Sequence, residues 1–185
     1  MATGGIVERT AEQCRFSYRD SVFKHAGERG AAHEVILSAK LALVPGDAKA
    51  IASSIHEKIV YRAEHHPLEH PNIGSIFKNV PLEAIHGSTS PRYRAALAKQ
   101  SLTFKGSLFS VKTDPFPVIS AAKLIGETGL RGVHFGGAMI SPKHPNFIVN
   151  SLGASAEDVK KLMTLAKAEV KKKFGVALEE EVQIV

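Results

Sequence analysis

The sequence SAEDVKKLMTLAKAEVKKKFG at residues 155–175 decides which class of fold the chain can form. Ser155 and Asp158 have the spacing of a capping box, in which two side chains bond the free backbone N–H groups at a helix start. Apolar residues follow at intervals of three and four positions, which places them on one helix face; they are Val159, Leu162, Met163, Ala166 and Val170. Gly175 is the residue type that commonly ends a helix. We therefore predict a long amphipathic helix over this stretch.

Strand patterns lie on both sides of this helix. The apolar run at 147–149 reads as a buried strand, and residues 179–185 alternate, with Val182 and Ile184 on one face and Glu181 and Gln183 on the other. We expect further helices at 92–99 and 119–127, the latter closed by Gly129, a strand at 106–112, and loops at 70–75 and 87–91. The predicted fold class is α+β, with helices packed on a mainly antiparallel sheet.

The N-terminal part has a different pattern. Residues 5–9 and 34–43 are strand candidates, and apolar residues alternate along the second of them from Val35 to Leu43. Pro45-Gly46 interrupts the pattern, and Ala52, Ile55 and Ile59 then recur at helical spacing over 47–65. We take this change as a domain boundary, with one domain at 1–46 and a second at 47–185.

Composition limits the classes of function. The chain has 185 residues, 44% of them hydrophobic and 23% charged, which is typical of a globular protein. Cys14 is the only cysteine, which excludes an intrachain disulfide and a cysteine-based zinc site. The nine histidines lack zinc-type spacing, so we expect no metal. No signal peptide or membrane-spanning apolar run is visible in the sequence, and we expect a cytoplasmic location.

The charge is compatible with more than one partner. The formal net charge is +6, with 24 Lys and Arg against 18 Asp and Glu. A basic chain can bind nucleic acid, an anionic membrane surface or a phosphorylated small molecule. The positive residues are spread along the chain, and no basic and aromatic residues interleave as in a base-stacking surface. Nucleic-acid binding is therefore the weakest of the hypotheses.

Four short stretches carry the most specific signal. They are YRDSVFK at 18–24, PNIGSIFKN at 71–79, GLRGVHFGGAMISPKHPNFIVN at 129–150, and LEEEV at 178–182. In this order and spacing they resemble the UDP-N-acetylenolpyruvoylglucosamine reductase family, also called UDP-N-acetylmuramate dehydrogenases. The resemblance covers nearly the whole chain, and its Gly-Ser-x-Phe-Lys-Asn element is specific.

The resemblance implies a reaction and three catalytic residues. The family reduces UDP-N-acetylglucosamine enolpyruvate to UDP-N-acetylmuramate for peptidoglycan synthesis, using NADPH through a bound FAD. Ser75 matches the family's proton donor to the carbanion-like carbon, and a serine can protonate so basic a centre within hydrogen-bond reach. Arg19 matches a residue that can hold the substrate carboxylate in a bidentate fork, and Glu181 one that orients the site. Without the family, they would be read as a turn serine, an exposed arginine paired with Asp20, and a solvated glutamate.

Four more positions match substrate contacts of the family: Tyr18, Asn79, Arg131 and His144. For Arg131 the physical reason is that a cation can bind a diphosphate, and the alternative is an arginine that interacts with a helix C-terminus. His144 stands where another branch of the family often has glutamine, so its contact can differ.

The chain also departs from the family pattern. The glycine-rich flavin-binding region that precedes the Tyr-Arg-Asp-Ser motif has no counterpart in this sequence. We therefore expect residues 1–46 to be the C-terminal remnant of an FAD-binding domain and 47–185 to be the substrate-binding domain. Two alternatives stay open, a truncated sequence or one half of a split protein whose partner is a separate flavin-binding half. Residues 80–115 are longer than the usual connection, and Gln183 stands where arginine is common. The alternative function is a stand-alone UDP-sugar-binding module without redox activity.

Overall fold

The computed structural model describes residues 5–24, 34–113 and 116–184. The chain divides into two compact units, Met1–Ile51 and Ala52–Val185. Each unit is described below by itself.

Among the described residues before Ala48, the first unit contains short elements only. Helix α1 (Ala11–Cys14) begins with a capping box between Thr10 and Gln13, and the 3-10 turn η1 covers Val22–Lys24. The predicted strands at 5–9 and 34–43 were wrong, since neither segment is paired with another in the described part of this unit. Their apolar side chains are largely exposed, for example Leu43 at 85%. Alternating hydrophobicity produces a strand only where a neighbouring strand supplies hydrogen bonds and a core covers one face.

Helix α2 (Ala48–His65) confirms the helix predicted at 47–65. The Asp47 carboxylate accepts the backbone N–H of Ala50 at 2.8 Å and so caps its first turn. The apolar positions that predicted the helix are not core positions, because Ile55 and Ile59 are 53% and 60% exposed.

The second unit contains two four-stranded sheets in which every neighbouring pair is antiparallel. The first sheet has the order β1 (Asn72–Ser75), β8 (Phe147–Asn150), β7 (Ala138–Ile140) and β6 (His134–Phe135). The second has the order β2 (Val80–Pro81), β5 (Val118–Ile119), β4 (Ser107–Lys112) and β3 (Ser101–Phe104). The α+β class with mainly antiparallel strands is thus confirmed.

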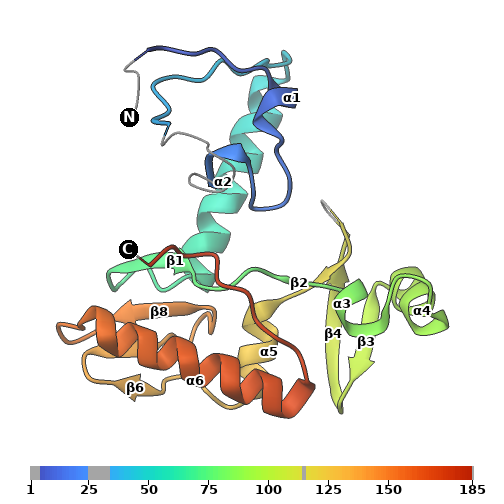
Figure 1. Ribbon diagram of the computed structural model, residues 1–185, viewed down its shortest axis with the longest axis vertical. Coiled ribbons are helices and arrows are strands. Elements are labelled where there is room, and N and C mark those ends of the chain that lie inside the picture. The colour runs from blue at the N-terminus through green and yellow to red at the C-terminus, as the bar shows by residue number, and fades with distance from the viewer. Residues whose placement is uncertain (1–4, 25–33, 114–115, 185) are drawn as a thin grey trace. The chain divides into compact units, whose positions relative to one another are not determined.

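Helices pack against these sheets (Figure 1). They are α3 (Glu83–His86), α4 (Pro91–Lys99), α5 (Ala121–Glu127) and α6 (Ala156–Phe174). The capping box of α6 forms as predicted, with bonds between Ser155 and Asp158 of 3.0 and 3.2 Å, and Gly175 ends the helix at a φ of 72°.

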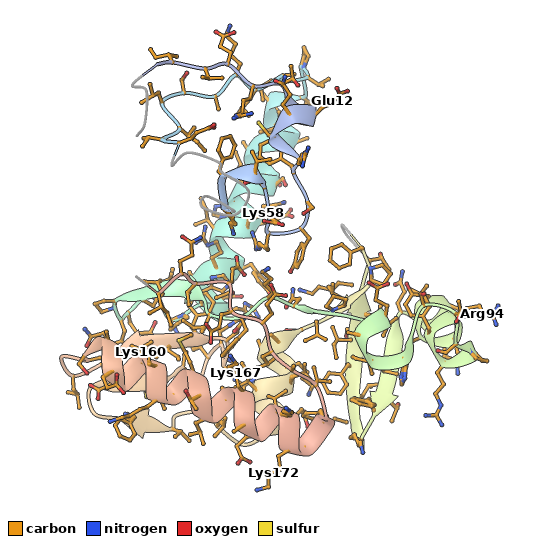
Figure 2. All side chains as sticks on the ribbon, in the orientation of Figure 1. Glu12, Lys58, Arg94, Lys160, Lys167 and Lys172 are labelled. Atoms are coloured by element: carbon orange, nitrogen blue, oxygen red, sulfur yellow. The ribbon has the colours of Figure 1, made fainter. Side chains whose placement is uncertain are left out.

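The apolar stripe of α6 lies in the core as expected. Leu162, Met163, Ala166 and Val170 are at most 3% exposed and share one cluster with residues of α5 and both sheets. Exposed lysines follow the solvent side of the helix, among them Lys160, Lys167 and Lys172 (Figure 2). One face of the helix therefore packs into a continuous core, and the other face is exposed to water.

Two predictions around the first sheet were wrong. The loop expected at 70–75 contains strand β1, which pairs with β8 through Asn72 with Val149 and Ser75 with Phe147. The pairing shifts between these two points, where Gly74 adopts a φ of 87°, so the glycine permits an irregularity that few other residues would tolerate. The strand expected at 179–185 is reduced to one bridge, between Phe77 and Glu180.

Candidate functional site

Ser75 ends strand β1, and the two residues after it are fixed by a buried asparagine. Ile76 donates its N–H to the backbone oxygen of Asn146 at 2.9 Å. The Asn146 side chain accepts the N–H of Phe77 at 3.0 Å and donates to the carbonyl oxygen of the same residue at 2.8 Å. Asn146 is 3% exposed, so these bonds are shielded from water and hold the chain that leaves Ser75 in one position.

Sequence reasoning missed Asn146, although the residue lies inside one of the motifs. A signal was present, because an asparagine directly before a buried strand must find partners for its amide. The sequence could not show which partner, since Phe77 lies 69 positions away.

Glu181 is bonded through its backbone to Ile76, the residue after Ser75. Its N–H donates to the carbonyl oxygen of Ile76 at 2.8 Å, and Lys78 donates its own N–H to the Glu179 oxygen at 2.9 Å. Together with the bridge from Phe77 to Glu180, these bonds place residues 179–181 antiparallel to residues 76–78. The segment that contains Glu181 thus pairs with the residues directly after Ser75, although the two predicted catalytic residues lie far apart in the sequence.

The three consecutive glutamates have different surroundings. The Glu179 carboxylate forms an ion pair with Lys78, and the Glu180 carboxylate forms one with Lys167 at 3.0 Å. These two glutamates bind the segment to the strand beside it and to α6. Glu180 and Glu181 are both partly buried, and the catalytic role of Glu181 stays a prediction.

Asn79 has a structural role in helix α5. Its side-chain oxygen accepts the N–H of Ala121 at 3.2 Å, and the Ser120 hydroxyl accepts that of Lys123 at 3.4 Å. These bonds satisfy two N–H groups at the helix start. A substrate contact of Asn79 stays a prediction. It would have to use the side-chain NH2 group, because the side-chain oxygen caps the helix.

Arg131 braces the loop that leads to His144. Its guanidinium donates to the carbonyl oxygen of Pro142 and, at 3.4 Å, to that of Lys143. Gly126 leaves room for this side chain, because an added Cβ there would come within 3.3 Å of two guanidinium nitrogens. The described bonds of Arg131 therefore go to a loop and not to the end of a helix.

His144 is half-buried in a small cluster of rings. Its ring centre lies 4.6 Å from that of Phe147 and 5.4 Å from that of His66, in edge-on arrangements. Burial, with a further contribution from His66, lowers the pKa of His144 to about 4. The imidazole is thus neutral at neutral pH. Its Nδ1 atom is buried, and no residue in the described part of the chain bonds it.

Tyr18 and Arg19 form the tip of a tight turn in the first unit. Ser17 and Asp20 exchange backbone bonds of 3.1 and 3.2 Å across this turn, and Arg19 has a φ of 58°. The Arg19 guanidinium carbon lies 5.8 Å from the centre of the Tyr18 ring. The structure places these two residues together, while Ser75, Asn79, Arg131, His144 and Glu181 belong to the second unit.

Within the described ranges, no three His, Cys, Asp or Glu side chains converge as metal ligands. None of the helices described is both long and apolar enough to cross a membrane.

A family model supplies the decisive comparison. The model of the UDP-N-acetylenolpyruvoylglucosamine reductase C-terminal domain matches residues 66–185. The chain belongs to this reductase family. The family assignment made from the four motifs is therefore confirmed.

Individual members of the reductase family are similar over most of the chain. The UDP-N-acetylenolpyruvoylglucosamine reductase of Carboxydothermus hydrogenoformans is 36% identical over 181 residues, which is 98% of this chain and 46% of that protein. Reductase 1 of Bacillus cereus is 35% identical over 184 residues, which is 98% of this chain and 47% of that protein. This chain spans about half the length of these relatives.

A solved member of the reductase family shows a partial likeness. The crystal structure of UDP-N-acetylenolpyruvylglucosamine reductase from Thermus caldophilus is 27% identical, with a TM-score of 0.43, and the match covers 73% of this chain and 34% of that one.

Proposed function

We propose that this chain forms the substrate-binding part of an enzyme that reduces UDP-N-acetylglucosamine enolpyruvate to UDP-N-acetylmuramate in peptidoglycan precursor synthesis. The observation that carries the proposal is the backbone pairing that places Glu181 beside the end of β1, where Ser75 lies. In the proposal, residues 47–185 are the substrate-binding domain, 1–46 are the remnant of an FAD-binding domain, and the reaction takes place in the cytoplasm.

Ser75 would supply the proton of the reaction. Reduction of the enolpyruvyl double bond at its methylene leaves negative charge on the carbon beside the carboxylate, and this carbon must be protonated. The serine hydroxyl donates its proton to that carbon, and the serine is then reprotonated from water. The bonds of Asn146 with Ile76 and Phe77, the two residues after Ser75, support this role, because a general acid must be held within hydrogen-bond reach of its target.

Charged residues would hold the substrate carboxylate and diphosphate. Arg19 can form two parallel bonds to the carboxylate and stabilise the charge that develops on it, with Glu181 orienting the site. Arg131 would contact the diphosphate. The neutral His144, with an unbonded Nδ1 among the described residues, can exchange a hydrogen bond with the ligand. Tyr18 and Asn79 complete the proposed set.

FAD and NADPH are not assigned to described residues of this chain. In the first unit, the described ranges contain no strand, and α1 and η1 are single short turns, which do not form the cradle that a dinucleotide needs. The proposal therefore includes a flavin-binding half as partner. The exposed apolar side chains of residues 34–44, such as Leu37 at 74% and Leu41 at 79%, support such a partner.

Ligand binding tests the substrate part of the proposal. UDP titrated into the full chain by calorimetry should bind, and Arg131→Ala should weaken binding by about 1–3 kcal/mol, the range for a hydrogen bond to a charged group. Arg94→Ala, an exposed arginine on α4 (Figure 2), is the matched control and should leave binding unchanged. Thermal melts of both variants separate loss of contact from loss of fold. Equal affinities of wild type and Arg131→Ala would remove Arg131 from the site.

Kinetics test the catalytic part. In an enzyme assembled from this chain and a flavin-binding half, Ser75→Ala should leave flavin reduction by NADPH near its normal rate. Reoxidation by the enolpyruvyl substrate should slow by roughly two orders of magnitude, the usual scale for losing a general acid. Ser75→Cys should recover part of the loss, and the exposed Ser110→Ala is the control. A chain that binds UDP but gives no turnover with any flavin-binding half would instead be a stand-alone binding module.

A further inference from the structure

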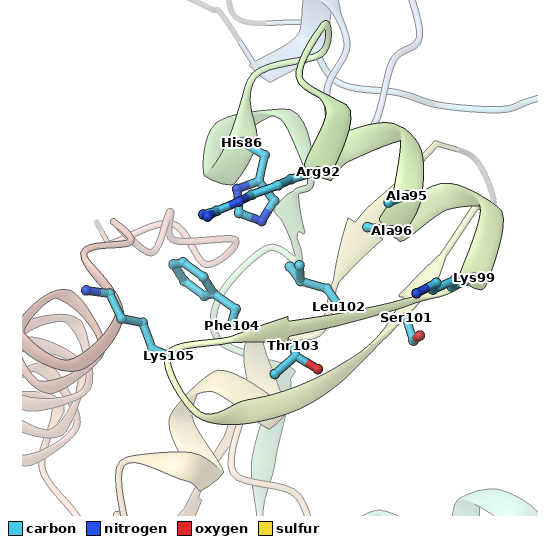
Figure 3. A pocket seen from close by; sticks show the side chains of 10 residues that line it. All are labelled: His86, Arg92, Ala95, Ala96, Lys99, Ser101, Leu102, Thr103, Phe104 and Lys105. Atoms are coloured by element: carbon cyan, nitrogen blue, oxygen red, sulfur yellow. The ribbon is translucent and has the colours of Figure 1, made fainter.

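A cavity lies within residues 86–105 of the second unit. It has a volume of about 570 Å³ and is formed by α4, β3, the first residue of the β-turn that follows, and one residue of α3 (Figure 3). Leu102 and Phe104 contribute apolar surface, and His86 faces Phe104 edge-on with the ring centres 5.7 Å apart. None of the residues assigned above to the reductase site lines it.

The lining of this cavity is positively charged. Arg92, Lys99 and Lys105 contribute to it, and no Asp or Glu does. Over the ranges that the structure describes, the side chains of these three residues form no hydrogen bond or ion pair, whereas those of Lys123, Lys143 and Lys167 each pair with a carboxylate. Cations that share a concave surface without a counter-charge raise the local potential and attract an anion.

His86 adds a polar group to the cavity. Its Nε2 is buried and has no partner in the described part of the chain. Buried polar atoms are nearly always bonded, to protein, water or ligand. An oxygen-rich ligand in this cavity would provide acceptors close to the ring.

We propose that this cavity binds the oligophosphate group of a small molecule. Arg92, Lys99 and Lys105 line different parts of the cavity (Figure 3), so an extended di- or triphosphate can reach more of them than a single phosphate can. The planar guanidinium of Arg92 can bond two phosphate oxygens at once, while the lysines act as point charges. The Phe104 and Leu102 side chains offer apolar contact to the rest of such a ligand. The site is independent of the proposed reductase function.

Calorimetry with inorganic tripolyphosphate tests the inference on the full chain. At about 0.15 M salt, the wild type should bind with a dissociation constant below 1 mM, and monophosphate should bind at least tenfold more weakly. Arg92→Gln and Lys99→Gln should each weaken tripolyphosphate binding by about fivefold or more. Lys160→Gln and Lys172→Gln remove the same charge from exposed positions on α6 and should change it by less than twofold.

Further variants separate this site from others. Arg94→Gln should leave tripolyphosphate binding unchanged, because Arg94 is an exposed cation of the same helix that does not line the cavity. Lys105→Gln is the second variant if Arg92→Gln fails to fold, since Lys105 is exposed. Equal losses in the α6 and cavity variants would overturn the inference in favour of diffuse charge. Absence of binding, or binding only of single-stranded nucleic acid, would also overturn it.

Discussion

Replacement of Asn146 by alanine should destabilise the protein far more than its small change in volume suggests. The substitution removes two bonds, of 3.0 and 2.8 Å, from a residue that is 3% exposed, and Phe77, whose N–H and carbonyl lose their partner, is 2% exposed. An unsatisfied buried backbone group costs about 1–3 kcal/mol, so we expect a loss of roughly 2–4 kcal/mol in the free energy of unfolding. Urea denaturation of the full chain, followed by circular dichroism, measures it.

The control variant is at Asn150, four residues after Asn146. Asn150→Ala removes one exposed bond, from its side-chain oxygen to the N–H of Ala154 at 2.8 Å, and should cost less than about 1 kcal/mol. Similar losses for both variants would refute the argument that the buried asparagine holds the chain after Ser75.

Asn146→Asp gives an independent readout of the same bonds. An ionised carboxylate can accept the Phe77 N–H but would face the Phe77 carbonyl oxygen without a hydrogen to donate. The folded state should therefore raise the pKa of the introduced carboxyl, so the stability of the variant relative to wild type should be greatest at low pH and fall as the pH rises through that pKa. A variant that gains no stability on acidification relative to wild type would contradict the proposed geometry.

Three other predictions concern the same domain. The free energy of unfolding should fall by about 2 kcal/mol, after allowance for partial exposure, when the pH is lowered from 6.5 to 4. The reason is that the pKa of His144 is about 4 in the folded protein, so the unfolded chain takes up the proton first. His144→Gln should remove this part of the pH dependence, as measured by urea denaturation. Gly137→Ala should cost more than about 2 kcal/mol, since its Cβ would lie 2.5 Å from the Ala154 nitrogen. Ser155→Ala should lower the melting temperature through the loss of about 1 kcal/mol from the α6 cap.

Each of these predictions has a clear contrary result. The His144 argument fails if wild type and His144→Gln lose stability in parallel on acidification. For Gly137, the comparison is Gly46→Ala, whose Cβ would meet only the flexible Ile51 side chain, at 3.0 Å; equal effects would mean that backbone crowding is not the cause. An unchanged melting temperature for Ser155→Ala would mean that the capping bonds contribute nothing to folding.

Helices were predicted well from sequence because their signals are local. The cap at Ser155, the stripe behind it and Gly175 lie within one stretch, and α6 forms there with the expected buried face. The strands are less predictable, because a strand exists only where another segment supplies its partners. Strand β1 depends on β8, more than 70 residues later, and residues 34–43 alternate as a strand would but remain unpaired in the described unit.

The candidate site required both motif and structure. No periodicity relates Ser75 to Glu181, and only the family frame distinguishes Glu181 from the two glutamates before it. The structure adds that Glu179 and Glu180 pair with lysines and that Glu181 donates its backbone N–H to Ile76, the residue after Ser75. Asn146 could not be assigned from sequence, because its role depends on a partner that folding brings to it.

The packing of the segment at residues 80–115 limits how the domain can be shortened. Strands β2 and β4 both pair with β5, so the chain leaves and returns on the two sides of Ile119. Phe104 and Phe109 place their rings 6.1 and 5.6 Å from that of Phe174, at the last turn of α6. A chimera in which a short turn joined β2 directly to β5 would expose the Phe174 ring to water and leave one side of β5 unpaired. An engineered minimal domain would therefore have to replace Phe174 and redesign the exposed edge at the same time.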